Sequence, residues 1–265
     1  MINNIVHFVF GLKEQTIDFL FSYYLAILSA IVVNNPDKVY FYYHYEPKGE
    51  WWEKIKNSVH MVKVPIPTHF GKKPILKLAH KADYLRMKIL YKYGGVYMDI
   101  DTICVKPYKE LLKYDFVMGE EIPYGETPQN GLCNAIMFSK PLSEFLKIWM
   151  DNYEEYFQPH GWQEASVNLP YKLYKKYPEY IKVLSPKAFF YPNYNETQLI
   201  FEKDVDISKS LIILHLWESF SIKYIKNIKD YEWVTNNSQT LYGKIIMKNL
   251  ERFKNYNHNN YVKWY

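Results

Sequence analysis

The sequence predicts an α/β fold with a mainly parallel sheet flanked by helices. Three observations lead to this class: short runs of β-forming residues alternate with helical segments over the first hundred residues, turn-forming residues separate them, and 265 residues suit one α/β domain. We therefore expect residues 1–265 to form a single domain with two halves, 1–101 and 102–265.

The first half divides into alternating strands and helices. Asn34 to Asp37 contains Pro36 and ends the first helix, because proline disfavours helical geometry in the residue before it. Gly94 and Gly95 end a later helix, since glycine adopts the left-handed conformation of a helix C-cap easily. The expected strands are 4–10, 39–45, 60–64 and 96–100, and the expected helices are 16–33, 51–57 and 75–93.

The helix at 75–93 has two faces. Leu78, Ala82, Leu85 and Ile89 recur at helical spacing and form an apolar stripe, and Asp83 and Arg86 belong to the adjacent face with Ala79 and Leu90. In the second half we expect strands at 115–119, 133–138 and 210–216, and helices at 141–156 and 164–177.

Composition excludes several classes of protein. The net charge of +5 comes without a Lys/Arg block, so a nucleotide-sized anion suits the chain better than a nucleic acid. Two cysteines, Cys104 and Cys133, cannot form a disulfide framework and indicate buried thiols in a reducing compartment. The apolar run from Phe19 to Val33 is too short to cross a bilayer. We expect a soluble, cytoplasmic chain, with peripheral membrane contact as the alternative; the oligomeric state stays open.

The motif Tyr97-Met98-Asp99-Ile100-Asp101 carries the chemistry. In a strand, side chains two residues apart point to the same side, so the carboxylates of Asp99 and Asp101 could converge on one cation. Hard oxygen ligands favour Mn²⁺ or Mg²⁺ over zinc. Taken alone, the motif also fits two solvated aspartates in a turn.

The residues around this motif extend it. Ala79-x-x-Ala82-Asp83-x-x-Arg86 precedes Tyr93-Gly94-Gly95-x-Tyr97-x-Asp99-x-Asp101, and this block resembles the glycosyltransferases whose sugar-binding region contains a DXD motif. That family includes α-1,6-mannosyltransferases, α-1,4-galactosyltransferases and, distantly, the clostridial glucosylating toxins. Weaker matches are the opening strand at 5–10, the turn at 34–37, the segment at 134–141 and His215-Leu216-Trp217-Glu218-Ser219.

The resemblance implies a GT-A-like, Rossmann-related fold. Residues 1–101 would mainly bind a nucleotide-sugar donor, with a UDP-sugar preferred over GDP-mannose, and 102–265 would mainly form the acceptor half and a C-terminal segment for the metal and diphosphate. It further implies a Mn²⁺- or Mg²⁺-dependent, retaining transferase that acts on a glycan or glycolipid acceptor. The implied metal ligands are Asp99, Asp101 and His215, and the implied catalytic residues are Asp83, Arg86, Asp99 and Asp101.

Donor-binding residues follow from the same motifs and from the ends of the strands. A carboxylate at Asp83 can accept hydrogen bonds from sugar hydroxyls, and the guanidinium of Arg86 can donate in a fork to sugar or phosphate oxygens. The full expected donor set is Phe8, Val9, Ala82, Asp83, Arg86, Tyr97, Asp99, Asn134, Trp217 and Ser219, with His44 and Tyr45 as further candidates. Packing is an equally good explanation for Trp217 and a better one for Phe8.

The acceptor side is less determined. The family often has a Gly-Pro-containing segment where this chain has His160-Gly161-Trp162-Gln163-Glu164. Glu120, Glu121, Gln163 and Glu164 are candidate polar groups near the reacting centre, without a ranking among them.

Two other functional classes stay open from the sequence. The apolar strand followed by Asp99-Ile100-Asp101-Thr102 also fits haloacid-dehalogenase-like phosphatases, in which the first aspartate is a nucleophile. The later acidic motif of that class is missing, and its nucleophile usually lies on the opening strand. The other alternative is a nucleotide-sugar-binding protein that has lost catalysis.

Overall fold

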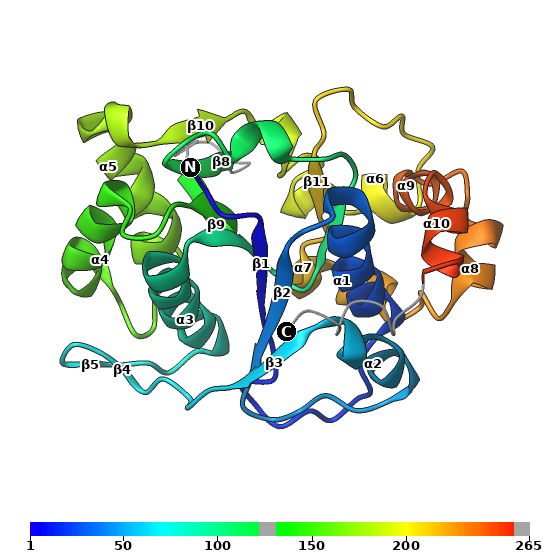
Figure 1. Cartoon of the computed structure of the whole chain (residues 1–265), viewed down its shortest axis with the longest axis horizontal. Coiled ribbons are helices and arrows are strands. Elements are labelled where there is room, and N and C mark those ends of the chain that lie inside the picture. Colours follow the sequence, from blue (N-terminus) through cyan, green and yellow to red (C-terminus); the bar gives the residue numbers. More distant parts are fainter. Residues whose placement is uncertain (122–130, 257–265) are drawn as a thin grey trace.

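The computed structural model describes residues 1–121 and 131–256 and has a central seven-stranded sheet (Figure 1). The strand order is β10-β8-β9-β6-β1-β2-β3. The bounds are β1 (Ile5–Val9), β2 (Lys38–Tyr43), β3 (His60–Lys63), β6 (Gly95–Met98), β8 (Phe116–Glu121), β9 (Gly131–Ser139) and β10 (Lys182–Leu184). Only β9 runs against its neighbours, and the other pairings are parallel, so the mainly parallel sheet is confirmed.

Two small antiparallel pairs lie outside the central sheet. One joins β7 (Thr102–Cys104) to β11 (Ile213–His215), and the other joins β4 (His69–Phe70) to β5 (Lys73–Pro74). The strand expected at 210–216 is therefore shorter than predicted and belongs to a separate ribbon. This ribbon positions part of the candidate site described below.

Helices cover both faces of the sheet, as expected for an α/β fold. In Figure 1, α3, α4 and α5 lie to one side of β1, whereas α1 and α7 to α10 lie to the other. The helices are α1 (Phe21–Asn34), α2 (Glu50–Ile55), α3 (Leu78–Tyr93), α4 (Glu144–Tyr156), α5 (Leu169–Lys176), α6 (Gln198–Phe201), α7 (Glu218–Ile225), α8 (Tyr231–Asn236), α9 (Leu241–Met247) and α10 (Leu250–Lys254). Within the described ranges, we find no helix with the length and apolar character needed to span a bilayer.

Short turns of other helix types complete the chain. A π-helix, η3 (Glu164–Asn168), leads directly into α5. The 3₁₀ segments are η1 (Lys56–Ser58), η2 (Lys109–Leu111), η4 (Pro178–Tyr180), η5 (Pro186–Ala188) and η6 (Tyr194–Glu196). The single helix expected at 164–177 is thus two segments of different pitch.

Alternation along the strands divides the core into two apolar clusters. Val96 and Met98 of β6 pack in the cluster that contains α1, and Tyr97 between them packs in the cluster that contains residues of α3, α4 and α5. This period of two is the geometric signature of a sheet covered on both faces. Cys104 and Cys133 are buried free thiols, as predicted.

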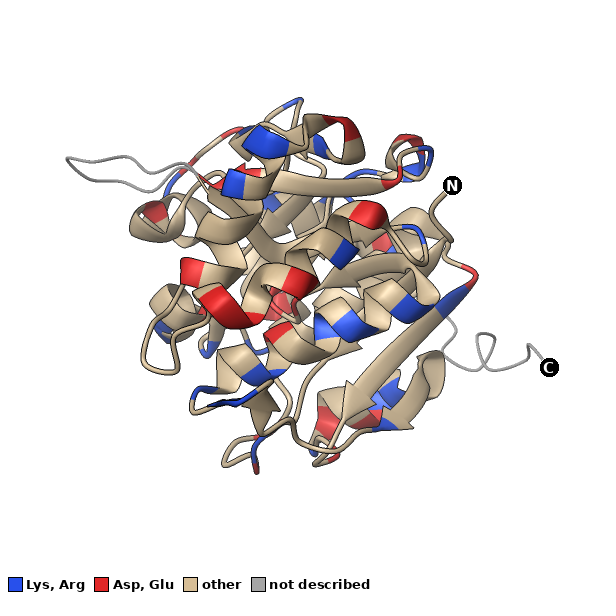
Figure 2. Ribbon diagram, turned by 90° about the vertical axis from the view of Figure 1, so that its left-hand side faces the viewer, with Lys and Arg blue, Asp and Glu red and all other residues tan. Residues whose placement is uncertain are grey.

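The surface on the α3–α5 side carries charges of both signs. Figure 2 views this side and shows Lys and Arg interspersed with Asp and Glu over the helices. The pattern agrees with the sequence, in which basic residues are not grouped into blocks.

Three expectations about individual segments were wrong. Helix α1 begins at Phe21 rather than Thr16, because the preceding chain forms a loop in which the Phe19 amide donates to Lys48 O at 2.7 Å. Strand β6 ends at Met98, so Asp99 and Asp101 do not share a strand face. Leu78 does not join the buried stripe of α3, since its side chain is 40% exposed.

Candidate active site

A tight turn between β6 and β7 displays the two aspartates. The Asp99 amide donates to Ala135 O on β9 at 2.8 Å, and the Thr102 hydroxyl donates to Asp99 O at 2.8 Å. The first bond extends the pairing of β6 with β9, and the second closes a turn directly after β6. Asp99 and Asp101 therefore converge because of the turn, and the i, i+2 strand geometry assumed from the sequence plays no part.

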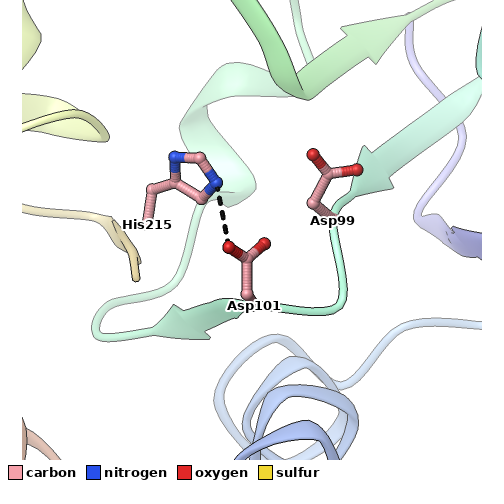
Figure 3. Close-up of side chains that lie close together, drawn as sticks. All are labelled: Asp99, Asp101 and His215. Atoms are coloured by element: carbon pink, nitrogen blue, oxygen red, sulfur yellow. Dashed lines mark ion pairs between the residues drawn. The ribbon is translucent and has the colours of Figure 1, made fainter. Parts of the chain in front are cut away.

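The β7–β11 ribbon brings His215 to this turn. In its register His215 pairs with Thr102, and the Leu216 amide donates to Asp101 O at 2.8 Å. His215 Nε2 lies 3.4 Å from Asp101 Oδ2. One ligand atom from each of Asp99, Asp101 and His215 lies within 4.8 Å of the others, and Figure 3 shows the three side chains directed at one small space. Two carboxylates and an imidazole form a donor set that suits Mn²⁺ or Mg²⁺.

The charges of this cluster are tightly coupled. Burial alone would raise the pKa of Asp101, but His215 and the Glu218 amide outweigh it and hold that pKa below its usual value. Burial lowers the pKa of His215, and Asp101 more than offsets this, so that the net shift is upward. The pKa of Asp99 is raised by burial and by the neighbouring Asp101, against the opposing effect of Arg86. The two aspartates therefore repel each other, and a divalent cation would relieve that repulsion.

A backbone kink places Glu218 beside the cluster. Trp217 has φ of 58°, a left-handed conformation that is uncommon for residues other than glycine. The kink directs the Glu218 amide to Asp101 Oδ2, to which it donates at 2.7 Å. The Glu218 carboxylate accepts from the Tyr23 hydroxyl at 2.8 Å, and burial together with Asp101 raises its pKa to about 7.

Arg86 is the centre of a buried polar network. Its Nη2 lies 3.0 Å from Asp99 Oδ1, and its Nη1 donates to both Asn134 O and Asn134 Oδ1 at 2.9 Å. The Asn134 amide in turn donates to Asp83 Oδ1 at 2.7 Å. The Tyr97 hydroxyl donates to Asp99 Oδ1 at 2.5 Å, and the guanidinium lies 4.5 Å from the centre of the Tyr97 ring. The network fixes the orientation of Asp99 from several sides.

A cavity of about 780 Å³ opens above the cluster and is large enough for a nucleotide sugar. One wall consists of α3 and the π-helix region, the other consists of the loop after β1 together with α7, and the aspartates, Asn134 and His215 lie between them. The predicted residues that line it are Val9, Ala82, Asp83, Arg86, Asp99, Asp101, Glu121, Asn134, Gln163, His215, Trp217 and Ser219.

Several other predicted residues do not line this cavity. Phe8 is fully buried in the apolar core, and Tyr97 is equally buried and reaches the site through its bond to Asp99 and its ring contact with Arg86. The expectation that these two contact the donor is not supported by the geometry, because the strand directs both rings into the core. His44, Tyr45, Glu120 and Glu164 are also outside the lining.

The cavity contains residues that the sequence did not single out for the site. Lys13 and Lys226 line it, as does Glu218. Leu78 and Trp162 line it as well, although Leu78 had been assigned to the core. Trp162 belongs to the segment His160–Glu164, which departs from the family pattern. This departure is the one feature of the sequence that could have drawn attention to it.

Comparison with known proteins agrees with this geometry. The profile described as a glycosyltransferase sugar-binding region containing a DXD motif matches residues 9–117. Glucan organizing enzyme 1 of Cryptococcus neoformans var. grubii is 32% identical over 241 residues, which cover 86% of this chain and 66% of the fungal protein. The chain carries the sugar-binding region of this glycosyltransferase family.

One further curated relative and one solved structure are also similar to the chain. Human α-1,4-N-acetylglucosaminyltransferase is 26% identical over 151 residues, covering 51% of this chain and 42% of that enzyme. The chain thus spans less than two thirds of the length of either curated relative. Mouse xyloside xylosyltransferase 1 matches in fold, with a TM-score of 0.51 at 9% identity, over 81% of this chain and 98% of the mouse chain. The expected GT-A-like architecture is confirmed.

The geometry also weakens the phosphatase alternative. That chemistry requires Asp99 as a free nucleophile. Here Asp99 Oδ1 accepts from Tyr97 and pairs with Arg86, and Asp99 Oδ2 accepts from Arg86 Nη1 at 3.5 Å. These bonds stabilise the negative charge of Asp99 and so lower its nucleophilicity, and they leave a lone pair on Oδ2 for a cation.

Proposed function

We propose that this glycosyltransferase family member is an active, metal-dependent enzyme that transfers a sugar from a nucleotide-sugar donor to a glycan or glycolipid acceptor. One observation carries the proposal: Asp99, Asp101 and His215, which come from two distant parts of the sequence, converge within 4.8 Å beside a cavity of about 780 Å³. Two carboxylates this close together repel each other, and a divalent cation would add to the compensation that Arg86 and His215 provide.

A divalent cation held by these three residues would neutralise charge on the departing diphosphate. The acceptor hydroxyl oxygen would bond to the anomeric carbon of the donor while the bond from that carbon to the diphosphate oxygen breaks. The hydroxyl proton is released along with the nucleoside diphosphate. Asp83 and Arg86 would hold the sugar, since both line the cavity from α3.

The opposite wall suits the anionic part of the donor. Lys13 and Lys226 line the cavity there, and no salt bridge engages either ammonium in the described part of the chain. Cations placed beside a phosphate binding region raise the affinity for that group. We therefore place the nucleoside diphosphate between the metal cluster and this wall.

The finer features of the activity are predictions from the family resemblance. We expect Mn²⁺ as the preferred metal with Mg²⁺ as the alternative, a UDP-sugar in preference to GDP-mannose, and retention of the anomeric configuration. NMR of the product decides the last point, because α- and β-glycosides differ in their anomeric couplings.

The proposal is tested with a donor panel. Purified protein is mixed with UDP-glucose, UDP-galactose, UDP-N-acetylglucosamine or GDP-mannose, each with Mn²⁺ or with EDTA, and free nucleoside diphosphate is measured. We expect release from at least one donor with Mn²⁺ and its loss with EDTA. Release that EDTA leaves unchanged would contradict the metal site, and binding of a donor without any turnover would favour the inactive binding protein.

A further inference from the structure

Exposed apolar side chains surround the mouth of the cavity. Leu78 is 40% exposed and Trp162 is 53% exposed, and both line the cavity on the α3 side. Burying these surfaces against a ligand would be favourable, because large exposed apolar side chains gathered at a pocket usually mark a binding surface.

The indole of Trp162 is exposed, and hydrogen bonds hold the backbone that carries it. Lys77 Nζ donates to His160 O at 2.7 Å and to Gly161 O at 2.6 Å, which ties the preceding turn to the start of α3. The Trp162 amide donates to Glu164 Oε2 at 2.8 Å, and its carbonyl accepts from the Ser166 hydroxyl at 3.3 Å. The chain then enters the π-helix η3, a conformation found frequently at functional sites.

The position of this surface relative to the donor can be read from α3. Arg86 and Asp83 lie near the metal cluster, and Leu78 is the first residue of the same helix. With a rise of about 1.5 Å per residue, Leu78 lies about 12 Å along the helix from Arg86. This span leaves room for the donor sugar beside Asp83 and for one further sugar ring beside Leu78 and Trp162.

The charges around Trp162 and Leu78 favour a neutral ligand at this end of the cavity. The Lys77 ammonium is the nearest cation, at 5.3 Å from the centre of the Trp162 ring, and two backbone carbonyls already engage it. Lys13 and Lys226 lie on the opposite wall. An anionic group therefore binds better at the far end of the cavity than against Trp162.

We propose that Trp162 and Leu78 form the acceptor subsite, which takes a neutral hexopyranose ring with its apolar C–H face against the indole. A large, flat aromatic ring supplies contact area with little loss of conformational entropy, and its negative face attracts the slightly positive C–H groups of a sugar. The inference rests on the proposed function, because it takes the donor sugar to lie beside Asp83 and Arg86.

Binding of simple sugars tests the subsite separately from turnover. Methyl glycosides of glucose, galactose and mannose are titrated into the full chain with Mn²⁺ and UDP, and binding is followed by ligand-observed NMR. We expect at least one glycoside to bind, Trp162→Ala to weaken it at least tenfold, and Trp162→Phe to stay within about threefold of wild type because a ring is retained. Tyr180→Ala is the matched control, since Tyr180 is 38% exposed and lies outside the cavity lining.

The same variants distinguish this inference from the proposed function. Trp162→Ala should raise the acceptor KM in transfer at least tenfold, whereas the control Tyr180→Ala should leave acceptor KM, UDP affinity and donor hydrolysis at the wild-type level. A loss of UDP affinity in Trp162→Ala would assign the ring to the donor and overturn the subsite. Unchanged glycoside binding in that variant, or no glycoside binding to wild type, would overturn it too. Absence of donor hydrolysis in wild type instead counts against the proposed function.

Discussion

The buried guanidinium of Arg86 and the partly buried carboxylate of Asp99 form an ion pair, with Nη2 and Oδ1 3.0 Å apart. Only 4% of Arg86 is exposed, and its other terminal nitrogen is bonded to Asn134. Arg86 therefore holds Asp99 in place in addition to any contact with a donor. A lysine offers a point charge and cannot reproduce this fork.

Arg86→Lys should lower both turnover and stability. We expect a loss of about 2–4 kcal/mol in the free energy of unfolding, because buried oxygens of Asn134 and Asp99 lose partners. Urea unfolding and donor hydrolysis are measured on the same preparation, with Arg252→Lys as the control at an exposed position. Wild-type stability in Arg86→Lys would show that the network does not depend on the guanidinium.

Asp101→Asn should lower Mn²⁺ affinity and turnover together. The substitution keeps the side-chain size and removes the charge that binds the cation, so we expect transfer to slow by about a hundredfold or more. Without metal the melting temperature should change little, because relief of repulsion from Asp99 offsets the lost pairing with His215. Donor hydrolysis and melting temperature are followed in one Mn²⁺ titration.

The control for this titration is Asp151→Asn, which removes an exposed carboxylate paired with Lys147 at 2.9 Å. It should behave as wild type in both readouts, since exposed ion pairs contribute little. If Asp101→Asn retains full Mn²⁺-dependent transfer, Asp101 is not a principal ligand.

His7 should make the fold sensitive to acid. Burial lowers the pKa of His7 from 6.5 to about 4, although its Nε2 is bonded to Gly94 O at 2.8 Å. The pKa of His7 is lower in the folded chain than in the unfolded chain, so neutral His7 adds to the free energy of unfolding. This contribution is fully present above pH 6.5 and is lost as the pH falls toward 4. The expected loss between pH 7 and pH 4 is about 3 kcal/mol.

The measurement compares wild type with His7→Gln, whose amide can keep the bond to Gly94 O and does not titrate. Urea unfolding at several pH values gives both free energies. The difference between the two proteins should shift by about 3 kcal/mol in favour of the variant on acidification. A difference that is constant with pH would mean that His7 titrates normally in the folded chain.

Gly95→Ala should destabilise the strand that leads to Asp99. Gly95 has φ of +103°, and an added Cβ would lie 2.5 Å from Ile5 O. We expect a loss of at least about 2 kcal/mol in the free energy of unfolding. Gly161→Ala is the control, because the atom nearest to its added Cβ is the flexible Glu164 carboxylate and its φ is not in the left-handed region. Equal stability of the two variants would contradict this account.

Much of the first half of the fold could be predicted from local patterns. Gly94 caps α3 with φ of 64° and donates its amide to Leu90 O, as the glycine pair indicated. The start of α1 could not be found, because the apolar run beginning at Phe19 carries no capping signal and the loop before Phe21 is held by a bond to Lys48. The boundaries of such helices depend on hydrogen bonds between residues that are far apart in the sequence, and a short stretch of sequence does not reveal these bonds.

In the candidate site too, local patterns predict some features and long-range contacts decide the others. The motifs led us to propose Asp99, Asp101 and His215 as ligands, but they did not reveal why the three side chains converge, since the reason lies in a turn and in the β7–β11 ribbon. Trp162 was conspicuous only as a departure from the family pattern. Its role as part of the cavity wall depends on Lys77, a residue far away in sequence that ties its turn to α3.

The β7–β11 ribbon has a consequence for the proposed metal site. Residues 102–104 meet their partners only when residues 213–215 have been synthesised and have docked. A chain that lacks β11 would offer two of the three proposed ligands and would bind a cation much more weakly. If these residues hold the ion, metal binding would follow the pairing of two segments that are distant in the sequence, and it would stabilise only chains in which they have paired.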